Sequence, residues 1–364
     1  MASVPIIDMH ADVFMDLVRR REKQELSSIN TPNSALSESH NEINELVTLH
    51  LKRIHSGGIV GAILTDCRMA GERAEPEHLE RFIATVQAQL VNNSTNTYKN
   101  KIVNSEIQKN ELSFIHVLTA KDLDFALSHN IFAVIVGYEG LTATLGELGW
   151  FRRLYKEAGL RVAVLTHNDD NCFGGGSLGV LGGLPEPQSL GLTEKGREAV
   201  NLCNELGILI DISHAGKATR RDILNTSTVP VIFSHTSSKI VYDNGRNLTA
   251  AEMRLIADKG GVIGCMTSPA ALAHISDRKH HNLDRYMEHL LSMIDFAGID
   301  HVGLGLHFCE YLYDREKYPF VQGLEDAGHA QAIIKALFNL GFSEKDVEKI
   351  AWKNFVRVFR QILH

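Results

Sequence analysis

The stretch Ile6-Ile7-Asp8-Met9-His10-Ala11-Asp12, close to the N-terminus, changes from apolar to polar residues. Its leading isoleucines predict a buried β-strand. Alternate side chains of a strand share a face, so we expect Asp8, His10 and Asp12 to point the same way at the end of that strand. An imidazole beside a carboxylate suits a divalent metal with nitrogen and oxygen ligands. The pattern alone is not specific, and the argument depends on whether further ligands reach the same place.

The rest of the chain alternates short apolar runs with segments of helical spacing. The further apolar runs predict strands at 59–66, 131–136, 161–165, 208–212, 229–233, 261–266 and 301–306. They are apolar throughout rather than alternating, which is typical of a parallel sheet buried on both faces. Eight such units predict an α/β fold, a (β/α)8 TIM barrel with its active site at the C-terminal ends of the strands. A doubly wound sheet is disfavoured because no glycine-rich phosphate turn follows the first strand.

We expect one domain over residues 1–364. The segment at about 19–45 is rich in Ser, Asn and Glu and predicts a long loop with helical pieces, a lid or binding loop inserted into the barrel. Residues 92–110 predict a polar helix or loop at the surface. Apolar residues at helical spacing predict C-terminal helices at about 326–363.

Composition argues against several classes of partner. Lys+Arg 37 against Asp+Glu 44 gives a net charge of −7, and neither sign forms a long block. Nucleic acid and anionic membrane are therefore not expected partners. The five cysteines are scattered and form no CxxC pair, which indicates reduced thiols. No apolar run reaches membrane-spanning length, and the N-terminus lacks the features of a signal peptide. We expect a cytoplasmic protein.

A barrel brings the ends of its strands together, so polar side chains at those ends should meet in one pocket. These side chains are His10, Asp12, Asp66, Glu139, His167, His214, His235, Thr267 and His307. A single histidine at a strand end is more often a hydrogen-bonded core residue than a ligand. Four consecutive strands ending in Glu, His, His and His, after His-x-Asp on the first, are better explained by one metal site.

The set is large enough for two metals that share a carboxylate and a bridging hydroxide. Glu139 is the natural bridge. Apart from Asp66, it is the only carboxylate directly at the end of a predicted strand between the first and the fifth. Two cations would bring the pKa of a bound water towards neutrality and polarise a carbonyl group, as amide hydrolysis requires. Nitrogen and oxygen ligands admit Zn, Mn, Co or Fe.

A series of longer motifs spans nearly the whole chain. They are Ile7-Asp8-Met9-His10-Ala11-Asp12, Gly137-Tyr138-Glu139-Gly140, Leu165-Thr166-His167-Asn168, Gly191-Leu192-Thr193-Glu194-Lys195-Gly196-Arg197, Ile210-Asp211-Ile212-Ser213-His214, Pro230-Val231-Ile232-Phe233-Ser234-His235-Thr236-Ser237, Arg246-Asn247-Leu248, His301-Val302-Gly303-Leu304-Gly305 and Asn354-Phe355-Val356-Arg357-Val358-Phe359. In content and order they resemble the membrane (renal) dipeptidase family, the M19 metallopeptidases of the amidohydrolase superfamily. The block from 191 to 235 is the most specific, and the resemblance is thin in 19–45, 92–110 and 308–322.

The resemblance implies a barrel of the metal-dependent hydrolase type that holds two zinc ions. It makes His10 and Asp12 ligands of one zinc and His214 and His235 ligands of the other, with Glu139 between them. The zinc-bridging hydroxide would attack the peptide bond of a small dipeptide, including one with a C-terminal D-residue. A homodimer is also expected from the resemblance.

The resemblance also assigns residues to the substrate. His167 would hydrogen-bond the carbonyl oxygen as it becomes tetrahedral, an electrostatic role. Arg246 would pair with the terminal carboxylate through its fork of donors, and Asn247 beside it is assigned to substrate binding. Without the resemblance, Arg246 would be interpreted as a solvated loop arginine.

The eighth strand departs from the family, in which it ends in Asp-Phe-Asp-Gly and the first Asp contacts the bridging water and moves protons. The matching residues here are His307-Phe308-Cys309-Glu310. A neutral His307 could accept a proton and so act in catalysis with Glu139 and His167, although two cations would depress its pKa. His307 could instead ligate a metal, or Glu310 could reach in from the loop. The sequence leaves these alternatives open.

Three functions are consistent with these residues. The leading hypothesis is a zinc-dependent dipeptidase. The second is a metal-dependent hydrolase of another amide or a modified peptide. The third is a metal-bound pseudoenzyme that binds peptides without hydrolysing them. The altered eighth strand motivates the second and the third.

Overall fold

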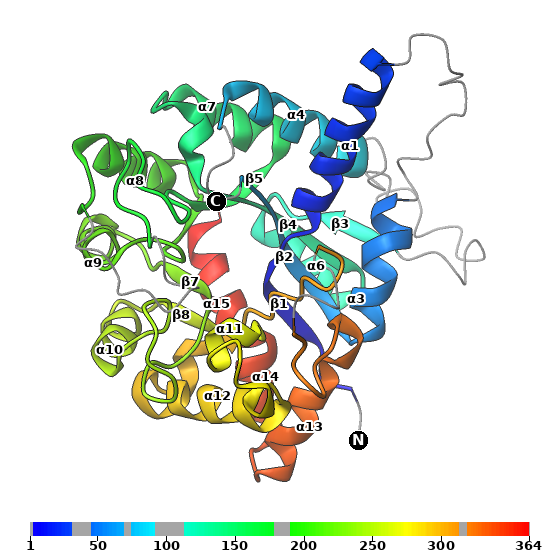
Figure 1. Ribbon diagram of the computed structural model, residues 1–364, viewed down its shortest axis with the longest axis vertical. Coiled ribbons are helices and arrows are strands. Elements are labelled where there is room, and N and C mark those ends of the chain that lie inside the picture. Colours follow the sequence, from blue (N-terminus) through cyan, green and yellow to red (C-terminus); the bar gives the residue numbers. More distant parts are fainter. Residues whose placement is uncertain are drawn as a thin grey trace.

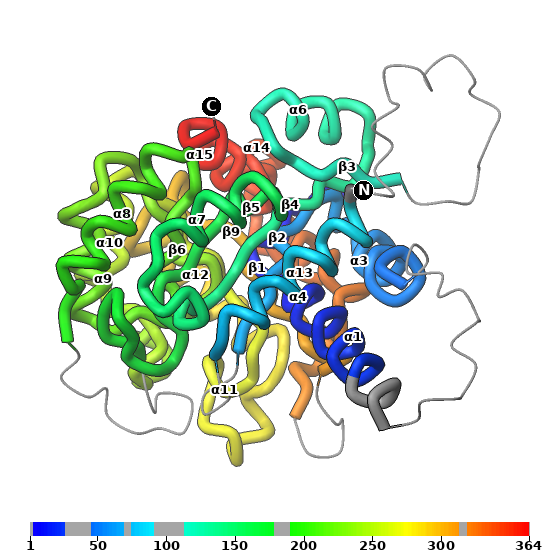
Figure 2. Tube along the Cα trace, turned by 90° about the horizontal axis from the view of Figure 1, so that it is seen from above, coloured from blue at the N-terminus to red at the C-terminus, as the bar shows by residue number. Residues whose placement is uncertain are grey.

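Eight parallel strands form a nearly closed ring at the centre of the structure, with helices around it (Figures 1 and 2). This computed structural model describes residues 3–30, 45–68, 74–91, 113–177, 190–312 and 319–363. The strands pair in the order β1 (Ile6–Ala11), β2 (Ile59–Cys67), β4 (Phe132–Glu139), β5 (Leu160–Val164), β6 (Leu209–Asp211), β7 (Ile232–Thr236), β8 (Val262–Cys265) and β9 (Val302–Leu304). The predicted (β/α)8 barrel is confirmed.

Two differences from the predicted strands matter. The short strand β3 (Phe114–His116) pairs with β4 outside the ring, and three residues are too few to give a recognisable periodicity. Strand β7 begins at Ile232 rather than at residue 229, so His235 lies inside the strand and not beyond its end.

The helices lie around the ring (Figure 2). They are α1 (Val13–Asn30), α3 (Lys52–Ser56), α4 (Pro76–Val86), α6 (Ala120–Ser128), α7 (Gly149–Arg153), α8 (Glu194–Leu206), α9 (Lys217–Thr226), α10 (Ala250–Asp258), α11 (Pro269–Leu272), α12 (Leu283–Ala297), α13 (Gln331–Asn339), α14 (Glu344–Glu348) and α15 (Asn354–Ile362). Side-chain hydrogen bonds cap the N-termini of some of them. Thr193 caps α8 by accepting from the Gly196 N–H group, and Thr249 forms a capping box with Glu252 at α10.

The polar segment at 19–45, predicted as a long loop with helical pieces, begins as a helix. Helix α1 continues to Asn30, and the Arg20 Nε atom donates to Asp16 Oδ2 one turn earlier at 2.8 Å. The polar composition is explained by exposure, because the buried side chains of α1 lie in its first turns, up to Val18. Residues 31–44, and the segment predicted at 92–110, lie outside the described residues, so the lid stays a prediction.

The core forms two clusters because each strand buries both of its faces. One cluster lies between the strands and the surrounding helices. The other joins alternate residues of the strands to helix α15, and it contains Ile7, Met9, Ile63, Ile135, Val162, Leu209, Ile232, Val262, Phe355 and Phe359. Helix α15 therefore packs against the strands (red in Figure 1). This burial on two sides is why the strands are apolar throughout.

Asp8 closes the seam between β1 and β9. Its Oδ1 atom accepts hydrogen bonds from the Leu306 N–H group at 2.7 Å and the His10 N–H group at 3.1 Å. The His307 N–H group donates to the His10 carbonyl at 3.1 Å. Burial raises the pKa of Asp8 to about 7, and the backbone donors of His10 and Leu306 oppose that shift. The seam thus sets the end of β1 beside the segment that follows β9.

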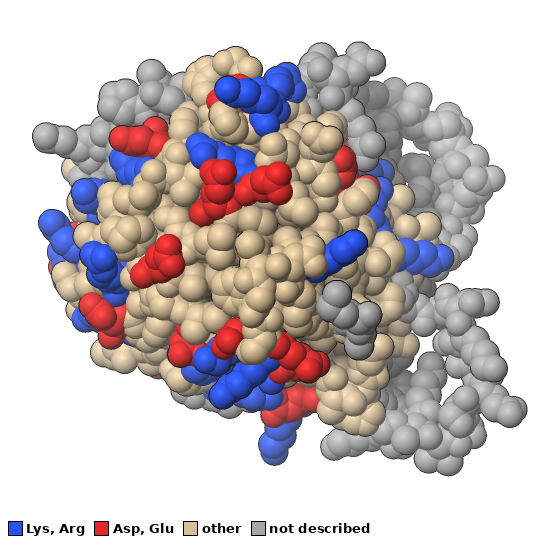
Figure 3. Space-filling model, turned by 90° about the horizontal axis from the view of Figure 1, so that it is seen from below, with Lys and Arg blue, Asp and Glu red and all other residues tan. Residues whose placement is uncertain are grey.

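The surface and the helices bear on possible partners. On the face in Figure 3, acidic and basic side chains are interspersed around a large uncharged area. Among the described residues, every helix is too short or too polar to cross a membrane.

Replacing Gly305 should destabilise the barrel beside β7. A Cβ atom at Gly305 would lie 1.6 Å from the Ser234 carbonyl oxygen and 3.3 Å from the Cα atom of His235. We expect Gly305→Ala to lower the free energy of unfolding by about 3 kcal/mol, because backbone cannot move away as a side chain would. Chemical denaturation measures this change. Gly149→Ala is the matched control, since its Cβ would meet nothing within 4 Å; equal stability of the two variants would contradict the prediction.

Candidate metal centre

The five predicted metal ligands lie together at the C-terminal ends of the strands. They form two overlapping groups, His10 with Asp12 and Glu139, and Glu139 with His214 and His235; within each group the donor atoms lie within 4.8 Å of one another. All five residues are buried. Glu139, the last residue of β4, is the member that the two groups share.

Glu139 lies among nitrogen donors without a hydrogen bond to them. Its Oε1 atom is 3.7 Å from His10 Nδ1, 3.7 Å from His214 Nε2 and 3.9 Å from His235 Nε2. These distances exceed a hydrogen bond but are close to the separation of about 3–4 Å between two ligands of one tetrahedral ion. Burial raises the pKa of Glu139 to about 8, and His10 opposes the shift.

The hydrogen bonds of His214 and His235 reveal which ring nitrogens carry lone pairs. The Oδ1 atom of Asn168 accepts from His214 Nδ1 at 2.9 Å, so the Nε2 atom of neutral His214 is unprotonated. Arg246 can only donate, and its Nη2 atom is 2.6 Å from His235 Nε2. His235 Nδ1 then carries the proton and donates to Ser234 Oγ at 2.7 Å.

These two unprotonated nitrogens face each other. His214 Nε2 and His235 Nε2 are 2.9 Å apart. Burial lowers the pKa of both rings well below the usual value, and the positive charge of Arg246 lowers it further. Two neutral imidazoles with opposed lone pairs repel each other unless a proton or a cation lies between them. The donor set therefore fits a divalent metal ion.

His10 and Asp12 form the other half of the centre. His10 Nε2 lies 3.2 Å from Asp12 Oδ1, and Thr65 Oγ1 donates to the same oxygen at 3.2 Å. Burial by itself would lower the pKa of His10, but Glu139 and Asp12 raise it to about 9. Burial would raise the pKa of Asp12, but His10 and His307 hold it well below its usual range. A cation could replace the proton that His10 carries between these carboxylates.

His167 faces the shared carboxylate from the loop after β5. Its Nε2 atom is 3.8 Å from Glu139 Oε2, and its ring stacks on His214 with centroids 4.2 Å apart. Burial lowers the pKa of His167 to about 3, so the ring is neutral and can donate one hydrogen bond. This approach requires Gly140, which has φ +71° and whose Cβ would lie 2.6 Å from the His167 Cβ atom.

Arg246 is part of the centre and not a solvated loop arginine. It is 3% exposed, and burial lowers its pKa to about 10 against the opposing charge of Glu139. The Nδ2 atom of Asn247 instead holds the surrounding loops by donating to the carbonyl oxygens of Tyr242 and Ala271, each at 2.9 Å. Asn247 Oδ1 is buried and has no hydrogen-bond partner among the described residues.

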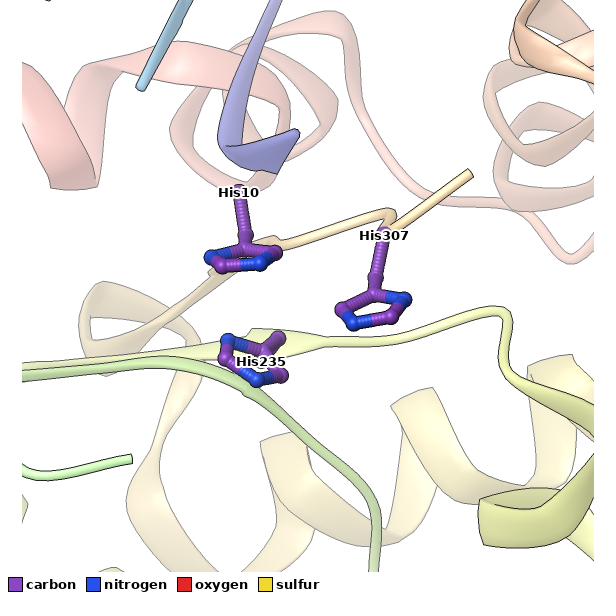
Figure 4. Close-up of side chains that lie close together, drawn as sticks. All are labelled: His10, His235 and His307. Carbon is purple, nitrogen blue, oxygen red and sulfur yellow. The ribbon is translucent and has the colours of Figure 1, made fainter. Parts of the chain in front are cut away.

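His307 lies beside the first half of the centre. Its Nε2 atom is 3.6 Å from Asp12 Oδ2. Its ring is stacked on His10, with centroids 4.9 Å apart and planes 11° from parallel. Figure 4 shows the rings of His10, His235 and His307 close together. Burial lowers the pKa of His307 to about 4, and Asp12 opposes the shift.

Comparison with known proteins identifies the family of the chain. The family described as membrane dipeptidase, peptidase family M19, matches residues 1–364. The chain belongs to the M19 dipeptidase family. An uncharacterized dipeptidase of Schizosaccharomyces pombe is 31% identical over 260 residues, which are 69% of this chain and 58% of that protein, so the chain spans less than two thirds of this relative.

Solved structures of metallopeptidases share the fold, and the first of them belongs to family M19. Dipeptidase AC has a TM-score of 0.74 and 21% identity, covering 100% of this M19 chain and 99% of its own. A Rhodobacter sphaeroides metallopeptidase, liganded with a phosphinate mimic of L-Ala-D-Ala, has a TM-score of 0.73 and 20% identity, with 99% and 100% covered. The expected family is confirmed, and it is a family of metallopeptidases.

Some polar residues at the strand ends do not join the centre of this M19 chain. Asp66 Oδ2 is bonded to His78 Nε2 of α4 at 2.8 Å, and both side chains are buried. Thr267 Oγ1 donates to the Leu306 carbonyl at 2.6 Å. The prediction that all strand-end polar groups meet in one pocket is wrong for Asp66, because it finds a nearer partner on α4, whereas Thr267 lines a pocket together with His307.

The alignment of Asp8 with His10 and Asp12 is also not observed. The pairing of β1 with β2 shifts register between Asp8 and Ala11, which ends the strict alternation of side chains. Asp8 is bonded at the barrel seam, as described above.

Glu310 does not replace the missing aspartate in this conformation. Its Oε1 atom accepts from Arg53 Nη1 at 2.9 Å. Among the described residues, Glu310 belongs to none of the groups of possible metal ligands. The loop after β9 directs its carboxylate to the segment before β2 instead.

Cys67 is a residue of the centre that the sequence patterns do not identify. It ends β2, pairs in register with Glu139, and lies with Glu139 and His167 in a third group of possible ligand atoms. Burial raises the pKa of its thiol well above the usual value, so the thiol is neutral. Cys67 directly follows Asp66, the end of the predicted strand, and this position could have identified it from the sequence.

Asn168 should strengthen metal binding although it is not among the predicted ligands. Removing the amide of Asn168 frees the ring of His214 to rotate and to change tautomer. We expect Asn168→Ala to weaken Zn²⁺ binding about 10–100-fold in competition with a chromophoric chelator. Asn168→Asp keeps an acceptor and should bind at least as tightly as the wild type. Equal affinities of wild type and Asn168→Ala would contradict this role.

Proposed function

We propose that the protein is a zinc-dependent dipeptidase that hydrolyses the peptide bond of small dipeptides. The observation that carries the proposal is the position of Glu139 between two buried pairs of ligands in a chain of the M19 family. In this proposal His10 and Asp12 hold one zinc ion, His214 and His235 hold the other, and Glu139 bridges them. When bound, the ions would polarise the peptide carbonyl and bring the pKa of the attacking water towards neutrality.

The side chains around the ions would orient the substrate. The guanidinium of Arg246 is buried, so a dipeptide carboxylate reaching it would form a charge-assisted hydrogen bond away from water. This assignment supports a substrate whose scissile bond lies next to its C-terminal residue, because only that residue carries the α-carboxylate. The Asn247 amide holds the loop that carries Arg246, and we assign its buried, unpartnered Oδ1 atom to substrate binding.

His167 would act on the carbonyl oxygen. Its ring is neutral and faces Glu139, so it can donate an N–H group to the oxygen as negative charge develops. A donor of this kind contributes more to the transition state than to the bound substrate. We assign catalysis to Glu139, to His167 and to His307, which follows β9.

A second candidate is a protein that binds peptides and metal without hydrolysing them. It is favoured by one observation, the histidine at position 307 where the family has an aspartate. The cytoplasmic location and the homodimer stay predictions from the sequence.

The two candidates differ in a direct assay. Purified protein loaded with Zn²⁺ should hydrolyse members of a panel of L-Xaa-L-Xaa and L-Xaa-D-Xaa dipeptides, including L-Ala-D-Ala, and a chelator should abolish the activity. Release of free amino acids is the measurement. A folded, zinc-loaded protein that cleaves no dipeptide but binds one in calorimetry would contradict the dipeptidase and favour the second candidate.

Arg246 should recognise the substrate carboxylate. Arg246→Lys keeps the charge but loses the planar fork, and we expect KM for dipeptides to rise about 10–100-fold with a smaller change in kcat. The control is a dipeptide amide, which lacks the carboxylate, and for this substrate the two proteins should differ little in kcat/KM. An equal loss on both substrates would contradict the role.

A further inference from the structure

We propose that His307 is itself a metal ligand, and that with His10 and His235 it gives this chain a three-imidazole face in place of the family's carboxylate. The proposal rests on the metal centre of the proposed function, and it concerns the first residue of the His307-Phe308-Cys309-Glu310 run, where the chain departs from the family pattern. It is tested below by metal binding alone, so that it can fail separately from the dipeptidase activity.

The distances place His307 among the ligands. The donor atoms of His10, His235 and His307 lie within 4.8 Å of one another, as do the donor atoms in each of the two groups around Glu139. The ring centroids of His10 and His235 are 3.9 Å apart, and that of His307 lies 4.9 Å from the first and 5.0 Å from the second. Figure 4 shows the three rings converging from three different segments of the barrel.

The carboxylate of Asp12 connects His307 to the first half of the centre. Its two oxygens face two imidazoles, Oδ1 at 3.2 Å from His10 Nε2 and Oδ2 at 3.6 Å from His307 Nε2. His307 thus places a ring nitrogen near an Asp12 oxygen, as the predicted ligand His10 does. Neighbouring ligands of one ion are separated by about 3–4 Å, and both of these distances from Asp12 lie in that range.

The backbone holds His307 in this position at some cost. Its φ angle is 53°, in the left-handed region that a histidine adopts rarely. The His307 N–H group is bonded to the His10 carbonyl, and the carbonyl of Leu306 accepts from both the backbone and the hydroxyl of Thr267. Strained residues persist where their surroundings over-determine them, and they cluster at functional sites. The predicted ligand His214 has the same kind of backbone, with φ 62°.

A role as proton acceptor fits the surroundings less well. A catalytic histidine base is normally oriented by an acceptor on its second ring nitrogen. The Nδ1 atom of His307 is buried and has no hydrogen-bond partner among the described residues. Among the described residues, no group at Nδ1 selects the tautomer that a base requires, although the charge of Asp12 favours a positive ring.

The exchange of a carboxylate for an imidazole should alter metal preference. A neutral nitrogen removes one negative charge from the ligand set and replaces a hard oxygen by a borderline donor. Imidazole suits Zn and Co, whereas carboxylate suits Mn. The wild type should therefore discriminate against Mn²⁺ more strongly than a variant that restores the aspartate.

The first experiment measures metal affinity in the absence of substrate. Zn²⁺, Co²⁺ and Mn²⁺ are titrated into metal-free wild type, His307→Gly and His307→Asp. Glycine and aspartate both tolerate a positive φ angle, so neither variant should lose the fold, and circular dichroism checks this. The matched control is His274→Gln, which changes a histidine bonded to Ser276 far from the described ligands in sequence.

We expect His307→Gly to lose about 100-fold or more in affinity for at least one equivalent of Zn²⁺, more than the loss typical of an outer-shell partner. Free imidazole should restore part of that affinity by filling the vacated space. His307→Asp should bind Zn²⁺ but should improve Mn²⁺ binding relative to Co²⁺ by about tenfold or more. His274→Gln should match the wild type for all three metals.

The second experiment reports on coordination directly. The visible absorption bands of the Co²⁺-loaded protein depend on the number and type of ligands, so they should change in position and intensity in His307→Gly and recover with imidazole. Unchanged Zn²⁺ affinity together with an unchanged Co²⁺ spectrum in His307→Gly would overturn the proposal. If the same variant nevertheless lost hydrolysis, His307 would be a proton-transfer residue and the proposed dipeptidase would stand. Ligation shown by both experiments in a protein that cleaves no peptide would uphold the proposal while the proposed function failed.

Discussion

The barrel seam at Asp8 is the interaction on which the metal centre depends. One carboxylate oxygen accepts the backbone N–H groups of Leu306 and His10, which joins the first strand to the segment after the last. In a barrel this junction is the place where sequence-distant ends must meet, and few strand-to-strand hydrogen bonds are available there. Because the carboxylate is buried, its backbone partners have no alternative in water, and losing it would leave two N–H groups unsatisfied. The same junction sets His10 and His307 face to face.

Around Glu139 the electrostatics of the centre are arranged for a cation. The carboxylate is surrounded by imidazole nitrogens that are too distant for hydrogen bonds, and burial favours its neutral form. His214 and His235 are kept neutral by burial and by Arg246, with their lone pairs opposed. Arg246 already brings positive charge to His235 Nε2, and a cation between the facing nitrogens would complete the charge balance of the centre.

Much of this centre could be predicted from residue types at strand ends. Glu139, His214 and His235 follow or end apolar runs, and a parallel barrel brings such ends together whatever the loops do. The failures have local causes. Asp66 also follows an apolar run, but its carboxylate bonds to His78 in the helix after the same strand. Asp8 does not share a face with His10 because the strand pairing shifts register after Asp8. Cys67 is one residue beyond a predicted end, and an isolated cysteine carries no pattern that distinguishes it from a core residue. In α1 the described side chains of residues 19–25 are exposed or half-buried, which explains their polarity, and composition alone cannot separate such a helix from a loop.

The sequence by itself determined the eight-strand barrel, the family and the five candidate ligands. The spacing of apolar residues, the order of strands along the chain and the motifs are all patterns among residues that are neighbours in the sequence. The tertiary structure decided what depends on contacts across the barrel. It turned Arg246 inward onto His235, tied Glu310 to Arg53 and placed His307 against Asp12 and His10. These three side chains lie in loops after strands, where no periodicity constrains direction. Their orientation is chosen by the nearest charge or hydrogen-bonding group, and that group is distant in the chain.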